Sequence, residues 1–600
     1  MGKKVYENRN DIDKKYRWDL EKMYPNEDLW LKDISKAETL TEEFLQRKGK
    51  VMDNSRSLLE ALKAMDDIGL LIEKAFVYAR MKMDEDNRDS HRQAMFDKIN
   101  TSASKILSAL SFLTPEILSS EEKTVKMFID ENPGLRVYRH MLEGIFNRKE
   151  HILSEKEENL LANLGQVTSA PHSIFNILNN SDLKFGSITD DYGNEIEITH
   201  GNYINFMESH NREVRKTAFE RMYQTYADMI NLIGTTYSYS VKTDVVYSQV
   251  RKYSSARDSA LSRDKIPESV YDNLINVVSS NLSNLHRYMK LRKDELGVDE
   301  LKMWDIYVPL VKLPERNIPF EEGVDIMLKA LKPLGQEYSN ALKKGVESRW
   351  IDVYETPGKT SGAYSFGSYD SMPYSLMNYT DTLKDVFTLV HEMGHSMHSF
   401  FTRQTQPYVY GDHSIFTAEV ASTVNESLLI RYLLNQNPDD EMKKYLLNFY
   451  LEEFRGTLFR QTMFAEFEHK CHSFVESGGS LTPDWLNTEY ENLNRKYYGK
   501  VVGEDDYIKY EWARIPHFYR AYYVYQYATG FSAATAISKK ILEGGEKERN
   551  DYLTFLTLGS SKYPVDLLKI AGVDMSSPEP VKKAMETFNA LLDEFETLKK

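Results

Sequence analysis

Two histidines four residues apart, His391 and His395, constrain this chain more than any other feature. They belong to the pentapeptide His-Glu-Met-Gly-His. On an α-helix, residues with this spacing lie on one face, so both imidazoles can reach a single metal ion. Glu392 is next in sequence to the first histidine, where its carboxylate can take a proton from a water molecule on the metal. The motif therefore predicts a zinc site with Glu392 as general base.

The surrounding sequence predicts the helix that this site needs. Thr382 and Asp385 have the spacing of a capping box, and apolar residues then recur at helical intervals up to residue 401. The preceding residues 350–379 are different, with repeated Pro and Gly between short Tyr-, Val- and Ser-rich pieces. Within them, residues 373–379 resemble a strand. We therefore expect a small β-sheet next to the metal-binding helix.

The rest of the chain is predicted to be mainly α-helical. Apolar residues follow helical periodicity over residues 18–118, 120–179, 212–349 and from 411 to the C-terminus. A β-hairpin is predicted at residues 185–200, where Asp-Tyr-Gly-Asn separates two alternating segments. With 600 residues the chain exceeds the size of one hydrophobic core. We expect an N-terminal helical domain over 1–200 and a catalytic domain over 201–600.

Composition narrows the choice of partners and compartment. The formal net charge of −15 disfavours a nucleic-acid partner, because phosphate binding requires a basic surface. No apolar run is long enough to cross a membrane, and the N-terminal segment lacks the apolar stretch of a secretory signal. The single cysteine, Cys471, excludes a disulfide within the chain and fits a reducing compartment. These features predict a cytoplasmic protein.

A third metal ligand is expected in a second helix, over residues 414–429. Glu419 and Glu426 are seven residues apart there and share a face, so one can bind the metal while the other supports a ligand imidazole. Spacing alone does not decide which is which. His398 falls on the same stripe as His391 and His395 and is expected to lie outside the ligand set, since two histidines and one glutamate complete it.

The segments HEMGHSMH and FTAEVASTVNE resemble the thimet oligopeptidase and oligoendopeptidase F family of zincins. Further similar segments lie at residues 18–20, 212–226, 362–365 and 376–379. The resemblance implies that Glu419 is the third zinc ligand, that Glu426 supports the site and that long helices enclose a deep substrate channel. It also implies that Gly362, Ala363, Tyr364 and Ser365 contact the peptide substrate.

A second segment with catalytic potential lies at residues 515–531, where His517 and five tyrosines fall within eleven residues. Phenol and imidazole groups can donate hydrogen bonds to the oxyanion that forms during peptide hydrolysis. By resemblance, Tyr525 is the favoured oxyanion donor. His517, Tyr519, Tyr522 and His398 are expected to contact the substrate or the transition state, although the spacing before Tyr522 departs from the thimet oligopeptidase pattern.

Taken together, the sequence predicts a zinc-dependent endopeptidase with one zinc ion per chain, acting on oligopeptides and leaving the oligomeric state open. One alternative is a zinc exopeptidase of the carboxypeptidase type, which shares the metal chemistry but cuts at a terminus. Another is a helical peptide-binding scaffold in which the motif is inert.

Overall fold

The computed structural model describes residues 6–312 and 316–598. Its internal contacts group the chain into two units, each assembled from three stretches of sequence. Unit 1 contains residues 1–149, 315–432 and 537–573, and unit 2 contains residues 150–314, 433–536 and 574–600. The sequence-based division at residue 200 stays a prediction. Residues 1–5, on which the expected lack of a secretory signal partly rests, lie outside the described residues.

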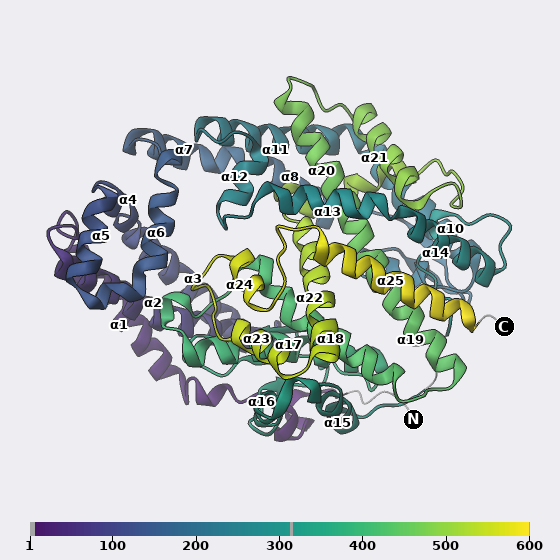
Figure 1. Cartoon of the computed structure of the whole chain (residues 1–600), viewed down its shortest axis with the longest axis horizontal. Helices are drawn as coiled ribbons and strands as arrows, with labels where there is room; N and C mark the ends of the chain where they lie inside the picture. The colour runs from purple at the N-terminus through teal and green to yellow at the C-terminus, as the bar shows by residue number, and fades with distance from the viewer. Residues whose placement is uncertain (1–5, 313–315, 599–600) are drawn as a thin grey trace. The chain divides into compact units, whose positions relative to one another are not determined.

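Unit 1 is a helical assembly, whose helices are labelled in Figure 1, with one small sheet. Its helices are α1 (Glu27–Leu45), α2 (Ser55–Glu85), α3 (Ser90–Leu110), α4 (Leu113–Leu118), α5 (Glu122–Glu131), α6 (Arg139–Asn147), α15 (Phe320–Ala330), α16 (Gly335–Glu347), α17 (Leu383–Thr405), α18 (Ile415–Leu434), α23 (Glu546–Leu556) and α24 (Pro564–Ile570). Helices α18 and α22 (Tyr525–Gly544) each contain a boundary between units.

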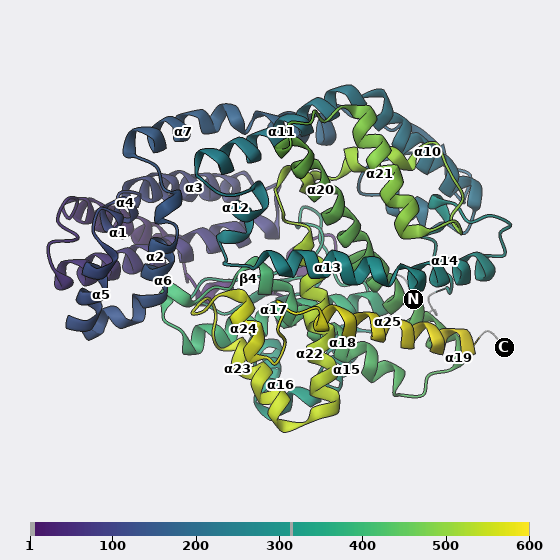
Figure 2. The same ribbon diagram turned by 45° about the horizontal axis from the view of Figure 1, so that its top comes forward.

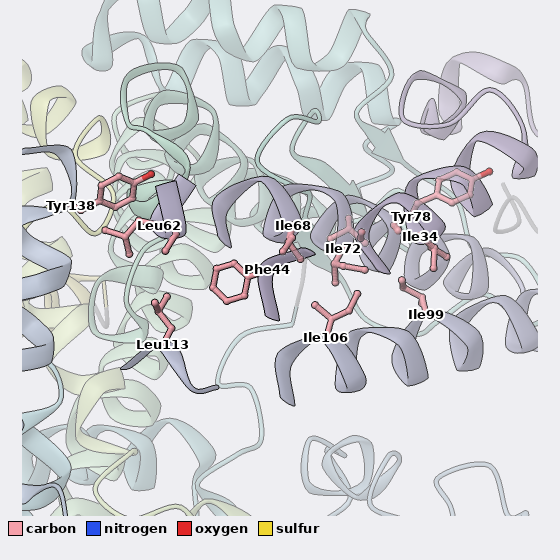
Figure 3. Packing of buried hydrophobic residues seen from close by; sticks show 14 of the residues in the cluster. Ile34, Phe44, Leu62, Ile68, Ile72, Tyr78, Ile99, Ile106, Leu113 and Tyr138 are labelled. Atoms are coloured by element: carbon pink, nitrogen blue, oxygen red, sulfur yellow. The ribbon is translucent and has the colours of Figure 1, made fainter. Parts of the chain in front are cut away.

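The N-terminal part of unit 1 is held together by apolar side chains between α1, α2 and α3, which run side by side (Figure 2). Buried residues on these helices recur at helical spacing, so each helix turns one apolar stripe inward. Figure 3 shows Ile34 and Phe44 of α1, Ile68 and Ile72 of α2, and Ile106 of α3 meeting in this core. Burial of this apolar surface fixes the position of α2. Other residues of α2 line a cavity that His391 and His395 also line.

The sheet of unit 1 has three short strands in the order β3-β5-β4. Strand β3 (Ile351–Asp352) pairs in parallel with β5 (Tyr374–Leu376), and β4 (Tyr364–Phe366) pairs antiparallel with β5, with Ser365 opposite Ser375. The hydroxyl groups of both serines lie within 3.0 Å of the Ser396 hydroxyl on α17. The predicted small sheet next to the metal-binding helix is therefore confirmed.

Unit 2 is also helical. It contains α7 (Glu155–Thr168), α8 (Ala170–Ile177), α9 (Tyr203–Met207), α10 (Arg212–Asp228), α11 (Ile230–Val250), α12 (Ala256–Ser262), α13 (Glu268–Ser280), α14 (Leu282–Leu296), α19 (Asp440–Glu453), α20 (Arg460–Glu476), α21 (Pro483–Tyr498) and α25 (Glu579–Thr597). The predicted hairpin is present as β1 (Ser187–Thr189) and β2 (Glu195–Glu197), paired antiparallel.

The mainly α-helical fold predicted from the sequence is confirmed. Within the described ranges, none of the helices combines the length and apolar character that a membrane span requires. The deep channel that the family resemblance implies stays a prediction.

Candidate metal centre

Helix α17 begins with the capping box predicted from the sequence. The Thr382 hydroxyl accepts a hydrogen bond from the Asp385 N–H, and the Asp385 carboxylate accepts one in return from the Thr382 N–H. This exchange satisfies N–H groups that have no partner within the helix and fixes where the helix starts. Two turns later, His391 and His395 project from one face with their Nε2 atoms 3.2 Å apart.

The third side chain of the group is Glu419, which α18 supplies. Its Oε2 atom lies 3.5 Å from His391 Nε2 and 3.4 Å from His395 Nε2. A tetrahedral zinc ion with bonds of about 2.0–2.2 Å has neighbouring ligand atoms about 3.3–3.6 Å apart. The three atoms therefore match one face of such a tetrahedron. Within residues 6–312 and 316–598, they form the only set of three or more His, Cys, Asp and Glu side chains close enough to share a metal ion.

Glu426 lies on the other side of the His391 ring from Glu419. Its Oε1 atom is 3.1 Å from His391 Nδ1. A carboxylate at Nδ1 keeps the proton on that nitrogen and leaves the Nε2 lone pair for a metal. Burial raises the pKa of Glu419, but its close contacts with the His391 and His395 imidazoles outweigh that effect and hold the pKa below its usual value. The structure thus gives Glu419 and Glu426 different positions where spacing alone left them equivalent.

Gly394 determines how closely α17 approaches α18. A Cβ atom at this position would lie 2.6 Å from Ser422 Cα and 2.8 Å from the Ala421 carbonyl oxygen, both in the backbone of α18. Backbone atoms cannot move aside as the end of a flexible side chain can. The glycine of the motif therefore allows the close helix contact that brings Glu419 to the two histidines.

Glu392 is only 6% exposed, and its carboxylate lines the same cavity as the three ligand side chains. Its Oε2 atom has no hydrogen-bond partner among the described residues. Burial raises the pKa of Glu392, with the nearby histidines opposing that effect. A desolvated carboxyl group next to the metal ligands is suited to accept and return a proton.

The cavity beside the metal ligands has a volume of about 890 Å³. One wall is β4 with its neighbours, residues 363–367, and another is formed by Met65, Asp66, Glu73, Phe76 and Val77 of α2. Among the strands that the structure describes, β4 pairs only with β5, so its other edge has no strand partner. Ala363, Tyr364 and Ser365 line the cavity, whereas Gly362 does not and instead accepts a hydrogen bond from the Asn378 side chain.

His398 is placed apart from the cavity lining. It is 1% exposed, and its ring stacks on His413 with centroids 4.2 Å apart. The sequence pattern did not single out His413, Ser399 or Arg403, all of which line the cavity. Ser399 and Arg403 follow His395 at intervals of four residues, so the helical stripe contained the signal for them. His413 precedes α18, where no periodicity applies.

In unit 2, the aromatic segment forms a turn between a 3₁₀-helix (Pro516–Tyr519) and α22. Tyr519 stacks on Phe175, and its hydroxyl lies 2.9 Å from the Thr236 hydroxyl. Tyr522 is buried, and its N–H donates to the Glu468 carboxylate. Tyr525 is only 2% exposed.

Three other side chains of this segment, those of His517, Tyr523 and Tyr527, are partly or fully exposed on unit 2. The rings of His517 and Tyr523 are nearly parallel, with centroids 5.7 Å apart, and Tyr527 packs edge-on against both. The Tyr527 hydroxyl lies 3.4 Å from His517 Nε2 and 3.4 Å from the Tyr523 hydroxyl. Sequence reasoning did not favour Tyr523 and Tyr527. Their i, i+4 spacing at the start of α22 was the available signal.

Comparison with known proteins extends these observations over the whole chain. Residues 205–587 match peptidase family M3, and residues 116–185 match the oligopeptidase F family. The chain is 49% identical over 590 residues to oligopeptidase PepF of Bacillus subtilis, covering 98% of this chain and 88% of that protein. It is 43% identical to the group B oligopeptidase PepB of Streptococcus agalactiae, covering 99% of this chain and 98% of that protein.

A solved structure agrees with the sequence matches. Oligoendopeptidase-F from Enterococcus faecium superposes with a TM-score of 0.76 at 38% identity, covering 95% of this chain and 99% of that one.

Proposed function

The chain belongs to peptidase family M3, and from that premise we propose that it is a zinc-dependent endopeptidase that hydrolyses internal bonds of short peptides. It is a metallo-oligopeptidase, and peptides are its substrates. The observation that carries the finer proposal is the triangle of His391, His395 and Glu419, whose ligand atoms have the separations of a tetrahedral zinc site. Other divalent ions also bind such ligand sets, so the choice of zinc rests on these separations.

Glu392 carries out the proton transfers. It accepts a proton from the attacking water and delivers it to the nitrogen of the leaving amine, and its place in the cavity lining beside the ligand side chains suits that role. Zinc, when bound, supplies the Lewis acidity that polarises the scissile carbonyl and makes water acidic. Glu426 keeps His391 in the tautomer that presents Nε2 to the metal.

The peptide is held along β4. Its unpaired edge offers backbone N–H and C=O groups, and an extended peptide binds to such an edge as an added strand. Ala363, Tyr364 and Ser365, which line the cavity, are the proposed substrate contacts of this segment. For oxyanion stabilisation we propose, on the family resemblance alone, a donor from the aromatic segment, with Tyr525 favoured; within unit 2, Tyr525 is buried, whereas His517, Tyr523 and Tyr527 are more accessible.

The decisive experiment measures cleavage of a quenched fluorescent peptide that is blocked at both ends. The wild-type protein and Glu392→Gln are compared, with the metal content of each determined. We expect internal cleavage by the wild type, one zinc per chain in both proteins, and a loss of about 10²–10⁴-fold in kcat for the variant.

Each rival function gives a different result. A carboxypeptidase-type enzyme would cut the peptide only when its C-terminus is free. An inert scaffold would not cut it at all, and Glu392→Gln would then change nothing. Stoichiometric binding of a metal other than zinc in active protein would overturn the metal assignment alone.

A further inference from the structure

The last turn of α2 is joined to the loop that precedes β4 through one buried carboxylate, that of Asp84. Asp84 is fully buried, and its two oxygens accept hydrogen bonds from the Tyr364 hydroxyl and the Thr360 hydroxyl, each at 2.7 Å. Its backbone carbonyl also accepts the Thr360 N–H at 2.9 Å. Arg80, one turn earlier on α2, donates to the same carboxylate at 2.9 Å.

The loop is shaped to make this contact. Gly358 has a φ of +84°, and a Cβ atom there would lie 2.1 Å from Asp86 Oδ1 and 2.5 Å from Arg88 Nε. Its carbonyl oxygen accepts the Asn87 N–H at 2.7 Å. The positive φ favours glycine at position 358, where the chain comes close to the end of α2.

These contacts join the two walls of the cavity that contains the metal ligands. Helix α2 supplies one wall through residues such as Phe76 and Val77, and Tyr364 belongs to the strand that supplies the other. Asp84 lies beyond the cavity lining, two turns along α2 from Val77. Its hydrogen bond to Tyr364 sets where the substrate-binding strand lies relative to α2.

We propose that Asp84 is a positioning residue for substrate binding, which holds the free edge of β4 in the register that an added peptide strand requires. This inference rests on the proposed function, in which β4 receives the peptide. Asp84 does not touch the metal ligands. Its loss should therefore weaken peptide binding while metal binding and the chemical step are retained.

The chemistry of the contact supports a fixed position. Burial and the charge of Asp84 raise the pKa of Tyr364, so the phenol remains a donor throughout the working pH range. A buried carboxylate that loses one of its donors carries a large desolvation cost, so the strand is not easily released from it. The Tyr364 ring meanwhile remains against the cavity.

The test compares zinc-loaded wild type with Asp84→Ala, Asp84→Asn and Tyr364→Phe. Tyr364→Phe removes only the hydroxyl that Asp84 binds. For a peptide blocked at both ends, we expect KM to rise about tenfold or more in Asp84→Ala and several-fold in Tyr364→Phe. In both variants kcat should change less than threefold and the zinc content should stay at one per chain. Asp84→Asn keeps an acceptor oxygen and should fall between wild type and Asp84→Ala.

Glu60→Gln provides the matched control, because Glu60 lies on the same helix, away from the cavity lining, and forms ion pairs with Arg47 and Arg56. Its KM should equal that of wild type. Unchanged KM in Asp84→Ala and Tyr364→Phe would overturn the proposal, as would a fall in kcat with KM unchanged. If Asp84→Ala does not fold, Tyr364→Phe decides the question by the same criterion.

Binding measurements separate this proposal from the proposed function. The dissociation constant of a labelled blocked peptide is measured in Glu392→Gln protein with and without Asp84→Asn. If wild type does not cleave the peptide but Asp84→Asn still weakens its binding, the proposed endopeptidase activity fails and the positioning role stands. If the peptide binds equally to both proteins, the positioning role fails whether or not wild type cleaves.

Discussion

The metal centre and the aromatic segment differ in how directly sequence spacing fixes the positions of their side chains. The metal ligands lie on two regular helices, so residues four apart in α17 necessarily share a face. The tyrosines of residues 517–527 lie across a turn between a 3₁₀-helix and α22. There the direction of each side chain depends on individual backbone angles.

Tyr522 shows what this difference means. Its φ is +52°, a left-handed conformation that costs a residue with a Cβ atom about 1–2 kcal/mol. Contacts from α20 oppose this cost: Glu468 accepts the Tyr522 N–H at 2.7 Å, and His469 Nδ1 lies 3.3 Å from its hydroxyl. The change in chain direction at this residue separates the buried Tyr522 and Tyr525 from the more accessible Tyr523 and Tyr527. An alignment by spacing cannot detect it.

Substitution of the tyrosine hydroxyls tests this contrast with the largest expected effect. If the aromatic segment supplies the oxyanion donor, as proposed from the family resemblance, and an accessible hydroxyl fills that role, Tyr527→Phe should lower kcat about 10²–10³-fold, because the hydroxyl is lost while the ring remains. Tyr525→Phe, at a buried site, should change the melting temperature more than kcat. Steady-state kinetics on the blocked peptide check both variants. The opposite ranking would support Tyr525, the donor favoured by sequence resemblance, over Tyr527.

A smaller effect is expected from disturbing the regular helices of the metal centre. Gly394→Ala should displace α18 from α17, since the new Cβ meets backbone atoms of Ser422. A shift of about 1 Å in Glu419 should lower kcat/KM about 10²-fold. Zinc titration should show weaker binding at the same time. Ala418→Gly, on α18 next to Glu419 in sequence, is the control for a general change in helix stability, and should keep its zinc. Full activity in Gly394→Ala would mean that the helix contact does not position Glu419.

These cases indicate why the sequence predicted some features and not others. The shared face of His391 and His395 was predictable because a helix has a fixed period, and the helical class of the chain was predictable for the same reason. Spacing could not separate Glu419 from Glu426, since both lie on one face of α18. Their distances to His391 depend on the packing of two helices, which no local pattern encodes.

Two further placements depend on contacts distant in sequence. His398 shares the stripe of the metal ligands, yet its ring stacks on His413, a residue outside that helix. His469 and His472 lie three residues apart on α20, and both contact Tyr522, with His472 Nε2 3.3 Å from an Asp244 oxygen. Which partner a polar side chain meets was decided by the tertiary structure in both cases.

The carboxyl group beneath the aromatic turn leads to a prediction about pH. Burial raises the pKa of Glu468 to about 8, although His472 and the Tyr522 N–H act against this. Its unfolded value is 4.5, so between about pH 4.5 and 8 the folded protein binds more protons than the unfolded one. The stability contribution of Glu468 therefore falls as pH rises through this range.

Glu468→Gln should remove that dependence while keeping an acceptor for the Tyr522 N–H. We expect the variant to melt within 1 °C of wild type near pH 5 and on the order of 2–4 °C higher near pH 9, as followed by thermal unfolding at several pH values. Glu491→Gln replaces a partly exposed glutamate on α21 that pairs with Arg495, and should follow wild type throughout. A constant difference between Glu468→Gln and wild type at every pH would mean that Glu468 is ionised in the folded protein across this range. Glu468 would then be a charged carboxylate, as the lowered pKa of Glu419 makes that residue at the metal centre. The two regions would differ in the backbone geometry that positions their side chains, and not in the charge of these carboxylates.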